Sequence, residues 1–263
     1  MKRTSERHVP GELSSFDDVA MDMRHRYAYS LVEIYARPDD DLLDVGAGEG
    51  YGATIVGDWV ASYRGVDVSS ETVEHATRRY GSAQVHFDHY AGDALPYPDD
   101  SFDLITSFQV IEHVADVDRY LEELSRVSRP DATILMTTPN RRLRLRDGER
   151  PWNRFHLREY DADGLRHVLE TKFSDVELFG IRGSATLESQ ELARLARARR
   201  LARWDRLGLR YALPRAIDAP LRSAFRRRRG RGDAPLPLIS EMWHTKDELD
   251  RALDLFAVAR AKR

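Results

Sequence analysis

The stretch DVGAGEGYG, residues 44–52, decides the fold class of this chain. It overlaps the end of a mostly apolar segment, Leu42 to Val45, which predicts a short strand. Glycine at positions 46, 48 and 50 permits positive φ angles and lets a ligand approach the backbone closely. A glycine-rich turn between a first strand and a helix is where parallel α/β sheets bind nucleotide-like cofactors. We therefore expect a cofactor loop at residues 46–50.

The spacing of these glycines narrows the class of cofactor. A dinucleotide-binding fingerprint is GxGxxG, which from Gly46 requires a glycine at position 51. The chain has Tyr51 there, and its spacing is GxGxG. The glycine spacing therefore does not predict a dinucleotide-binding site.

Composition limits the protein class. The 263 residues are 41% hydrophobic and 32% charged, which predicts a folded protein with one main domain and an insertion. No window approaches 18 consecutive apolar residues, and the basic start has no apolar core behind it, so we expect neither a membrane span nor a secretory signal. The absence of cysteine excludes disulfides and zinc-thiolate sites and fits a reducing compartment. We expect a cytoplasmic protein, peripheral at a membrane in one alternative below.

Alternating short apolar runs and amphipathic stretches between Asp41 and Thr138 predict βαβ units and a parallel sheet. The expected strands are near Leu42–Val45, Tyr63–Val68, Gln84–Asp88, Phe102–Phe108, Thr133–Thr138, Val176–Ile181 and Leu253–Ala259. One helix is expected from Ser69 or Ser70 to Tyr80 and another from Asp116 or Asp118, with Gly81 and Pro130 as their stops. A third helix is expected near Asp161–Thr171.

The chain divides into three expected parts. Residues 1–36 form an N-terminal helical cap, and residues 37–186 with 241–263 form the core. Residues 187–240 form an arginine-rich insertion that is helical from Glu188 to Arg206, and four prolines interrupt its second part.

The insertion carries most of the charge asymmetry. Residues 190–233 hold 14 arginines and four acids, a balance of +10, while the whole chain has a net charge of −3. Such a block fits a solvated helical face, an anionic glycan or membrane surface, or nucleic acid. Its aromatics, Trp204, Tyr211 and Phe225, are too sparse for base stacking, so nucleic acid is the least favoured partner. A leucine stripe beside the arginines favours a membrane interface or a lid.

The pattern (D/E)xGxGxG after the first strand resembles the first motif of class I S-adenosylmethionine-dependent methyltransferases, of the methyltransferase type 11, ubiquinone-biosynthesis-like group. The resemblance implies a Rossmann-like α/β fold. Its sheet is expected to have seven mostly parallel strands, with an antiparallel final strand and helices on both faces. The implied cofactor is S-adenosylmethionine, and the product is S-adenosylhomocysteine.

The resemblance also assigns cofactor contacts. Asp44 would serve the amino acid end and Asp67 the ribose hydroxyls, while Asp93 would lie near the adenine amino group. The remaining expected contacts are Arg26, Gly46, Ala47, Gly48, Glu49, Gly50, Val68, Ala94, Phe108, Gln109 and His113. His113 could instead be a helix-start residue packed against the sheet. Arg26 could instead cap the adjacent helix or pair with its acids.

The acceptor side resembles a bacterial subgroup that methylates hydroxyls of sugars, glycans and related natural products. The resemblance rests on TPN at 138–140, NRFHLRE at 153–159, and ERHVPGEL and HRY near the start. An aliphatic hydroxyl must lose its proton during attack, and histidine titrates near neutral pH. His156 is therefore the candidate base, with Tyr27 positioning the substrate. A packed loop histidine bonded to Glu159 or to backbone is the alternative for His156. Tyr27 could instead cap the adjacent helix or pair with its acids.

The sequence thus predicts O-methylation of a sugar, oligosaccharide or glycosylated metabolite, which would be the small-molecule or glycan partner. Alternatives are a quinone-like or lipid acceptor at a membrane surface, and a scaffold that binds the cofactor without turnover. Glu112 or Asp116 could supply oxygen ligands, but no spacing specifies a metal site and none is predicted. Oligomeric state stays open.

Overall fold

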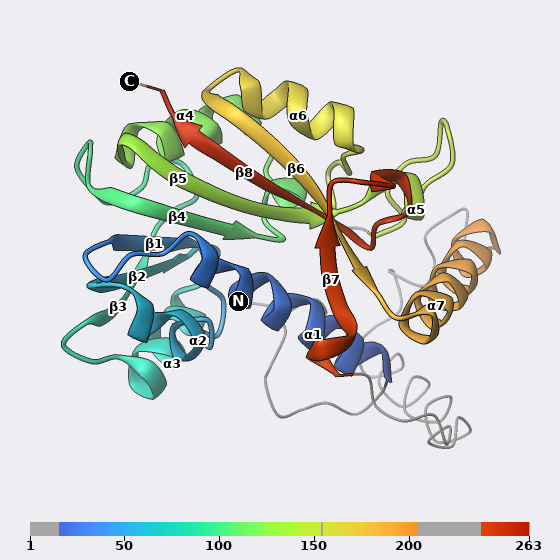
Figure 1. The fold of residues 1–263 in the computed structure, drawn as a ribbon, viewed down its shortest axis with the longest axis horizontal. Helices are drawn as coiled ribbons and strands as arrows, with labels where there is room; N and C mark the ends of the chain where they lie inside the picture. Colours follow the sequence, from blue (N-terminus) through green and yellow to red (C-terminus); the bar gives the residue numbers. More distant parts are fainter. Residues whose placement is uncertain (1–15, 154, 205–237, 263) are drawn as a thin grey trace.

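The computed structural model describes residues 16–153, 155–204 and 238–262, and they form one mixed sheet with helices packed on it (Figure 1). The strands are β1 (Asp41–Val45), β2 (Ser62–Asp67), β3 (Val85–His89), β4 (Phe102–Phe108), β5 (Ser128–Pro139), β6 (Phe173–Gly183), β7 (Met242–Thr245) and β8 (Asp254–Ala261). Their order is β3-β2-β1-β4-β5-β8-β6-β7. Strands β1 to β5 pair in parallel, whereas β8 runs antiparallel to β5 and β6, and β7 antiparallel to β6.

Several of the α-helices begin after a polar residue whose side chain accepts a hydrogen bond from a free backbone N–H group of the first turn. The α-helices are α1 (Phe16–Ser30), α2 (Ala53–Val56), α3 (Ser70–Tyr80), α4 (Val117–Val127), α5 (Arg141–Arg144), α6 (Ala162–Glu170) and α7 (Ala185–Trp204). Short 3-10 turns are η1 (Leu31–Ile34), η2 (Gly57–Trp59), η3 (Ile111–His113), η4 (Ile239–Glu241) and η5 (Leu249–Arg251). Ser69 caps α3, Asp116 caps α4 and Asp161 caps α6. Both predicted N-caps at Ser69 and Asp116 are confirmed.

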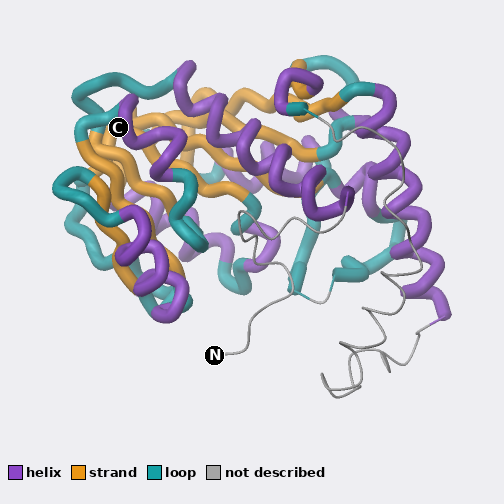
Figure 2. The backbone as a smooth tube through the Cα atoms, turned by 90° about the horizontal axis from the view of Figure 1, so that it is seen from below, coloured by secondary structure: helices purple, strands orange, loops and turns teal. Residues whose placement is uncertain are grey.

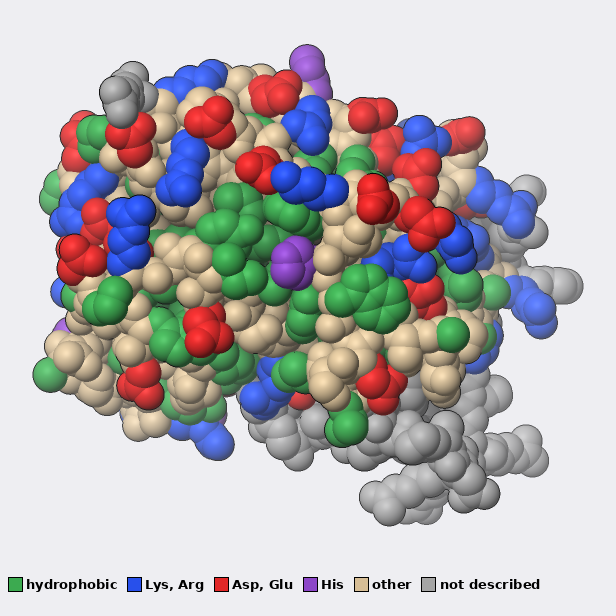
Figure 3. Space-filling view, in the orientation of Figure 1, with side chains coloured by type: hydrophobic (Ala, Val, Ile, Leu, Met, Phe, Trp, Pro, Cys, Tyr) green, Lys and Arg blue, Asp and Glu red, His purple; other side chains and the backbone are tan. Residues whose placement is uncertain are grey.

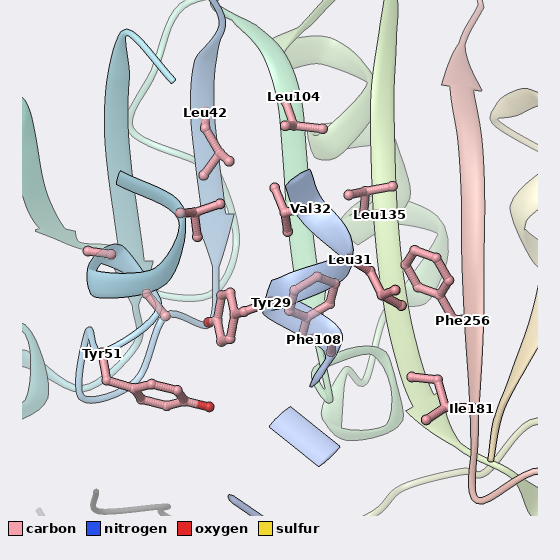
Figure 4. Packing of buried hydrophobic residues seen from close by; sticks show 14 of the residues in the cluster. Tyr29, Leu31, Val32, Leu42, Tyr51, Leu104, Phe108, Leu135, Ile181 and Phe256 are labelled. Atoms are coloured by element: carbon pink, nitrogen blue, oxygen red, sulfur yellow. The ribbon is translucent and has the colours of Figure 1, made fainter. Parts of the chain in front are cut away.

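Alternation along each strand gives the sheet two apolar faces. Leu42 and Leu104 point to the face covered by α1, η1, α2 and α3, and Leu43 and Ile105 point to the face covered by α4 and α6. Figure 2 shows helices on both sides of the strands, as expected. Figure 4 shows the first face, where residues of four strands lie with η1: Leu42, Leu104, Leu135, Phe256, Leu31 and Val32.

Two details of the predicted core are wrong. The sheet has eight strands in the described residues, not seven, because the short segment β7 adds to the edge of β6. Pro130 does not end α4, since that helix stops at Val127 and Pro130 already lies within β5. The antiparallel final strand is confirmed, and so is the strand Phe102–Phe108 with its predicted bounds.

The start of the predicted insertion is part of the fold. The expected helix is present as α7, with Leu195 buried and Leu192 exposed. Arg199 on α7 donates hydrogen bonds to the carbonyl oxygens of Leu143 and Arg144. The proline-rich half of the insertion, the arginine run at 226–229 and the ERHVPGEL segment lie outside the described residues. Within the described part of the chain, every helix is too short or too polar to cross a bilayer.

Candidate active site

The candidate site lies at one edge of the sheet because β1, β2 and β4 are parallel neighbours. Their carboxyl ends carry the glycine loop, Asp67 and the η3 turn respectively. The carboxyl ends of parallel strands are where open α/β sheets bind ligands. On the face shown in Figure 3, hydrophobic side chains gather near the middle, with charged side chains around them.

The glycine loop has the backbone that its sequence predicted. Gly46, Gly48 and Gly50 have φ angles of +78°, +55° and +79°. A Cβ at Gly46 would lie 2.4 Å from Val110, so this position is closed by packing. At Gly48 the nearest atom to such a Cβ would be a carbonyl oxygen 3.9 Å away. The loop is therefore packed at its start and open at Gly48, where a ligand could approach the backbone.

Asp67 links the glycine loop to the end of β2. Its carboxylate accepts hydrogen bonds from the backbone N–H of Gly48 at 3.1 Å and of Ser69 at 2.8 Å. Each carboxylate oxygen can accept more than one bond, which leaves capacity for ribose hydroxyls. Next to it, Val68 is exposed although it is a large apolar residue, and it lies beside Gly92. An acid followed by an exposed apolar side chain suits a ribose and the flat face of a base.

Asp44 is buried under α1 and holds that helix to the loop. It accepts hydrogen bonds from the hydroxyls of Tyr29 at 2.8 Å, Tyr63 at 2.5 Å and Thr106 at 2.8 Å. Burial raises the pKa of Asp44, and these three bonds partly offset that rise. The described contacts of Asp44 are thus with the chain itself, and its service to the amino acid end of the cofactor stays a prediction.

The other predicted contacts lie at several places around this edge. Asp93 and Ala94 are exposed after β3, and Phe108 is buried against the ring of Tyr29. Gln109 has a φ of +58°, and its side chain donates to Thr137.

Two further predicted contacts belong to the glycine loop itself. Glu49 is buried, and its carboxylate lies 3.3 Å from His75. Ala47 donates its N–H to Val66.

Arg26 and Tyr27 have partners on or near α1. Arg26 donates to Asp22, four residues earlier on α1, at 2.8 Å and lies over the ring of Tyr51. The Tyr27 hydroxyl lies 3.1 Å from His244 Nδ1 on β7. That hydrogen bond joins Tyr27 to a histidine that the sequence did not single out, and not to His156. His244 lies far from Tyr27 in the chain, so no local sequence pattern could have indicated their contact.

His156 is oriented by a buried ion pair. Its Nδ1 lies 2.8 Å from Glu159 Oε1, which also accepts from Arg144 at 3.0 Å. Burial alone would raise the pKa of Glu159, but the hydrogen bond from His156 and the charge of Arg144 hold it below its usual value. The bond to Glu159 that was the alternative for His156 is therefore present. It is compatible with catalysis, because catalytic histidines are commonly oriented by a carboxylate.

The structure also brings His156 to the η3 turn. The rings of His113 and His156 meet edge to face with centroids 4.9 Å apart, and His113 Nδ1 is 2.9 Å from the Phe155 carbonyl oxygen. Glu112, before His113, is buried, and one of its oxygens accepts from Thr138 at 3.0 Å. Burial raises the pKa of Glu112 to about 7, although the charge of His156 opposes that rise.

Comparison with known proteins decides the family. The family described as "Methyltransferase domain" matches residues 43–136. A protein of Mycolicibacterium smegmatis named as a probable S-adenosylmethionine-dependent methyltransferase is 34% identical over 211 residues, which cover 77% of this chain and 80% of that protein. This chain belongs to the S-adenosylmethionine-dependent methyltransferases. The cofactor of this methyltransferase is accordingly S-adenosylmethionine.

Solved structures show the same fold for this methyltransferase. The YcgJ protein of Bacillus subtilis superposes with a TM-score of 0.54 at 20% identity, over 91% of this chain and 99% of that one. The cyclase SpnF superposes with a TM-score of 0.56 at 21% identity, over 91% of this chain and 80% of that one. A fold shared with a cyclase does not define a reaction, so the family assignment rests on the sequence relative.

The residues present fit S-adenosylmethionine. The open backbone at Gly48, the carboxylate of Asp67 and the exposed Val68 lie at neighbouring strand ends. They offer a close backbone approach, acceptors for ribose hydroxyls and an apolar contact for adenine. These residues of the methyltransferase are the ones that we expect to hold the cofactor.

Substituting Gly48 tests this assignment. A methyl group at Gly48 would enter the open side of the loop, so Gly48→Ala is expected to weaken S-adenosylhomocysteine binding at least about tenfold, which corresponds to 1.4 kcal/mol. Gly148→Ala is the matched control, because Gly148 also has a positive φ, +76°, with nothing within 4 Å of its Cβ position. Calorimetric titration of both variants measures the difference. Equal binding by wild type and Gly48→Ala would contradict the assignment.

Glu112 predicts a pH dependence of stability. Its pKa of about 7 in the folded state lies above the ordinary value of 4.5, so folding favours the protonated acid. The free energy of unfolding should therefore fall as pH rises from about 5 to 8, by on the order of 3 kcal/mol. Glu112→Gln should lack that component, whereas Glu74→Gln, at an exposed site, should keep it. Urea denaturation in metal-free buffer at both pH values checks this, and parallel curves for wild type and Glu112→Gln would refute it.

Proposed function

We propose that this methyltransferase transfers the methyl group of S-adenosylmethionine to a hydroxyl of a sugar, oligosaccharide or glycosylated metabolite. The observation that carries the proposal is the pairing of His156 with Glu159 at 2.8 Å, beside the turn that follows β4. An aliphatic hydroxyl needs a base during attack, whereas more acidic acceptors can react without one. A carboxylate-oriented histidine at this place therefore favours an alcohol as the acceptor.

The chemistry follows from the tautomer of His156. With Nδ1 donating its proton to Glu159, the lone pair of the neutral ring is on Nε2. S-adenosylmethionine supplies an electrophilic methyl group on a positively charged sulfur. The acceptor oxygen forms the new bond to carbon, the carbon–sulfur bond breaks, and its electron pair neutralises the sulfur. His156 Nε2 accepts the hydroxyl proton, and the ionised Glu159 stabilises the resulting imidazolium.

The groups packed around Glu159 hold the hydrogen bond between Glu159 and His156 in place. Its side chain is fully buried, and Arg144 donates to the same oxygen that His156 contacts. The Arg144 guanidinium also lies over the ring of Trp152, 4.6 Å from its centroid. The base is thus held by packed groups rather than by solvent-exposed ones, which limits the freedom of the ring during proton transfer.

An acceptor screen tests the proposal. Purified protein is incubated with S-adenosylmethionine labelled in the methyl group and with sugars, glycans, quinols, phenols and phospholipids as separate acceptors. We expect label in a sugar or glycan hydroxyl, located by mass spectrometry. Transfer to quinols or lipids alone would replace the acceptor class. Binding of S-adenosylhomocysteine without transfer to any hydroxyl would favour the cofactor-binding scaffold.

One surface observation favours a second acceptor class, a lipid or quinone-like molecule at an anionic membrane. Leu238, Ile239 and Trp243 are large apolar side chains around η4, with 62%, 40% and 44% of their surface exposed. They follow the arginine-rich residues 190–233 in sequence, and basic segments beside apolar ones suit membrane interfaces. Co-sedimentation with anionic vesicles, but not with neutral ones, would support this acceptor, provided that exchanging Leu238 and Trp243 for serine abolishes it.

A further inference from the structure

Two histidines and a carboxylate meet beside the end of β4. Glu112 and His113 come from the η3 turn, and His156 comes from the loop that precedes α6. One nitrogen or oxygen atom of each lies within 4.8 Å of those of the other two. Glu112 is buried and His113 is exposed, so the group extends from the interior to the surface. An ion from solvent could therefore reach it.

Each of the three side chains is held by a hydrogen bond to one of its two polar atoms. The bonds join His113 Nδ1 to the Phe155 carbonyl oxygen at 2.9 Å, His156 Nδ1 to Glu159 Oε1 at 2.8 Å, and the Thr138 hydroxyl to Glu112 Oε2 at 3.0 Å. An Nδ1–H that donates to oxygen leaves the lone pair of a neutral imidazole on Nε2. Carbonyl and carboxylate partners of this kind fix the tautomer of metal-binding histidines in other proteins.

The remaining oxygen of Glu112 gives a second, independent indication. Glu112 is 0% exposed, and its Oε1 has no hydrogen-bond partner in the described part of the chain. A buried polar atom without a partner costs free energy, and native proteins rarely keep one without a reason. A cation bound to Oε1 would supply the missing interaction.

We propose that Glu112, His113 and His156 bind a divalent transition-metal cation. Two imidazole nitrogens and one carboxylate oxygen suit zinc, cobalt, manganese or iron, whereas magnesium and calcium prefer oxygen ligands alone. At bond lengths of about 2.1 Å the ligand atoms of a tetrahedral cation are about 3.4 Å apart, so small side-chain rotations would close the site. Three protein ligands leave at least one coordination position for water.

Cation binding gives His156 a second role that is exclusive of the first. A lone pair on Nε2 cannot accept the acceptor proton while it is bound to a cation. This consequence rests on the proposed function: if hydroxyl methylation depends on the cation, the base is a different group or a metal-bound water, and His156 is a ligand. Binding itself needs neither methyl donor nor acceptor, so it is measured separately.

Cobalt(II) is the probe for the test. The protein is treated with EDTA, dialysed and titrated with Co²⁺ while visible absorption is recorded. We expect ligand-field bands that saturate at one equivalent. Glu112→Gln, His113→Ala and His156→Ala should each weaken the affinity at least about 100-fold, because loss of a ligand should cost no less than loss of an outer-shell partner. His167→Ala, at an exposed site on α6, is the control and should bind as wild type does.

The same titration can also contradict the proposed cation site. Absence of these bands in protein that circular dichroism shows to be folded would overturn the proposal. So would wild-type affinity in both Glu112→Gln and His113→Ala, because the cation would then be bound elsewhere. Glu112→Gln keeps the size and shape of the side chain, so its binding can be measured even if a histidine variant fails to fold.

Discussion

Turnover on a hydroxyl acceptor is expected to fall at least about 100-fold in His156→Ala, the usual contribution of a positioned general base. The physical reason is that the imidazole that accepts the hydroxyl proton in the proposed mechanism would be absent. Binding of S-adenosylhomocysteine should be unchanged, because the glycine loop and Asp67 do not depend on His156. Steady-state kinetics with the labelled donor, together with calorimetry, measures both quantities.

Two further variants distinguish the role of His156 from a structural one. Glu159→Gln keeps a side chain of the same shape but no longer stabilises an imidazolium, so it should lower turnover and alter the pH profile. His167→Ala removes an exposed histidine elsewhere and should have no effect. Wild-type turnover in His156→Ala would exclude it as the base. If turnover instead falls in proportion to the Co²⁺ or Zn²⁺ content of each variant, His156 would be assigned to the cation site.

The parts of the site that depend on local sequence were predictable. The positive φ angles of Gly46 and Gly48 follow from glycine itself, and Ser69 caps α3 because a serine before an amphipathic stretch accepts the first free N–H. Asp67 could be placed beside Gly48 because parallel strands align their carboxyl ends. These inferences need only a few neighbouring residues and the strand order.

Contacts between distant segments were not predictable in this way. Glu112 and His156 meet because the loop before α6 returns to η3, and neither residue shows this in its own neighbourhood. Tyr27 meets His244 for the same reason, across α1 and β7. Strand β7 is too short for periodicity to reveal, since it is defined by pairing with β6.

The predicted insertion shows how charge patterning can mislead. The arginine content of α7 suggested a helix separate from the core. In the structure Glu191 of α7 is buried and bonded to Arg24 of α1. Arg24 also makes two hydrogen bonds with Asp254 at the start of β8, one of them at 2.6 Å. One guanidinium therefore joins α1, α7 and β8.

Replacing Arg24 is expected to have the largest effect on stability. In Arg24→Met the buried Asp254 loses the cation that it pairs with, and breaking a buried ion pair by removing one partner costs about 3 to 5 kcal/mol. Glu191 keeps Arg194, so its loss is smaller. The matched control is Arg78→Met, because Arg78 and Glu74 form an exposed pair on α3 worth about 0.3 to 0.5 kcal/mol. Urea denaturation at neutral pH gives both values.

The dependence of the free energy of unfolding on pH in the acid range gives an independent test of the ion pairs around Arg24. Burial alone would raise the pKa of Glu191, but the hydrogen bond from Arg194 and the charge of Arg24 hold it at about 2. Its contribution to stability is present above its ordinary pKa of 4.5 and is lost as pH falls toward 2. Arg24→Met should therefore lose less stability than wild type between pH 5 and 3. An equal acid dependence in both proteins, or a neutral-pH cost no larger than that of Arg78→Met, would show that Arg24 is not the residue that fastens α7 to the sheet.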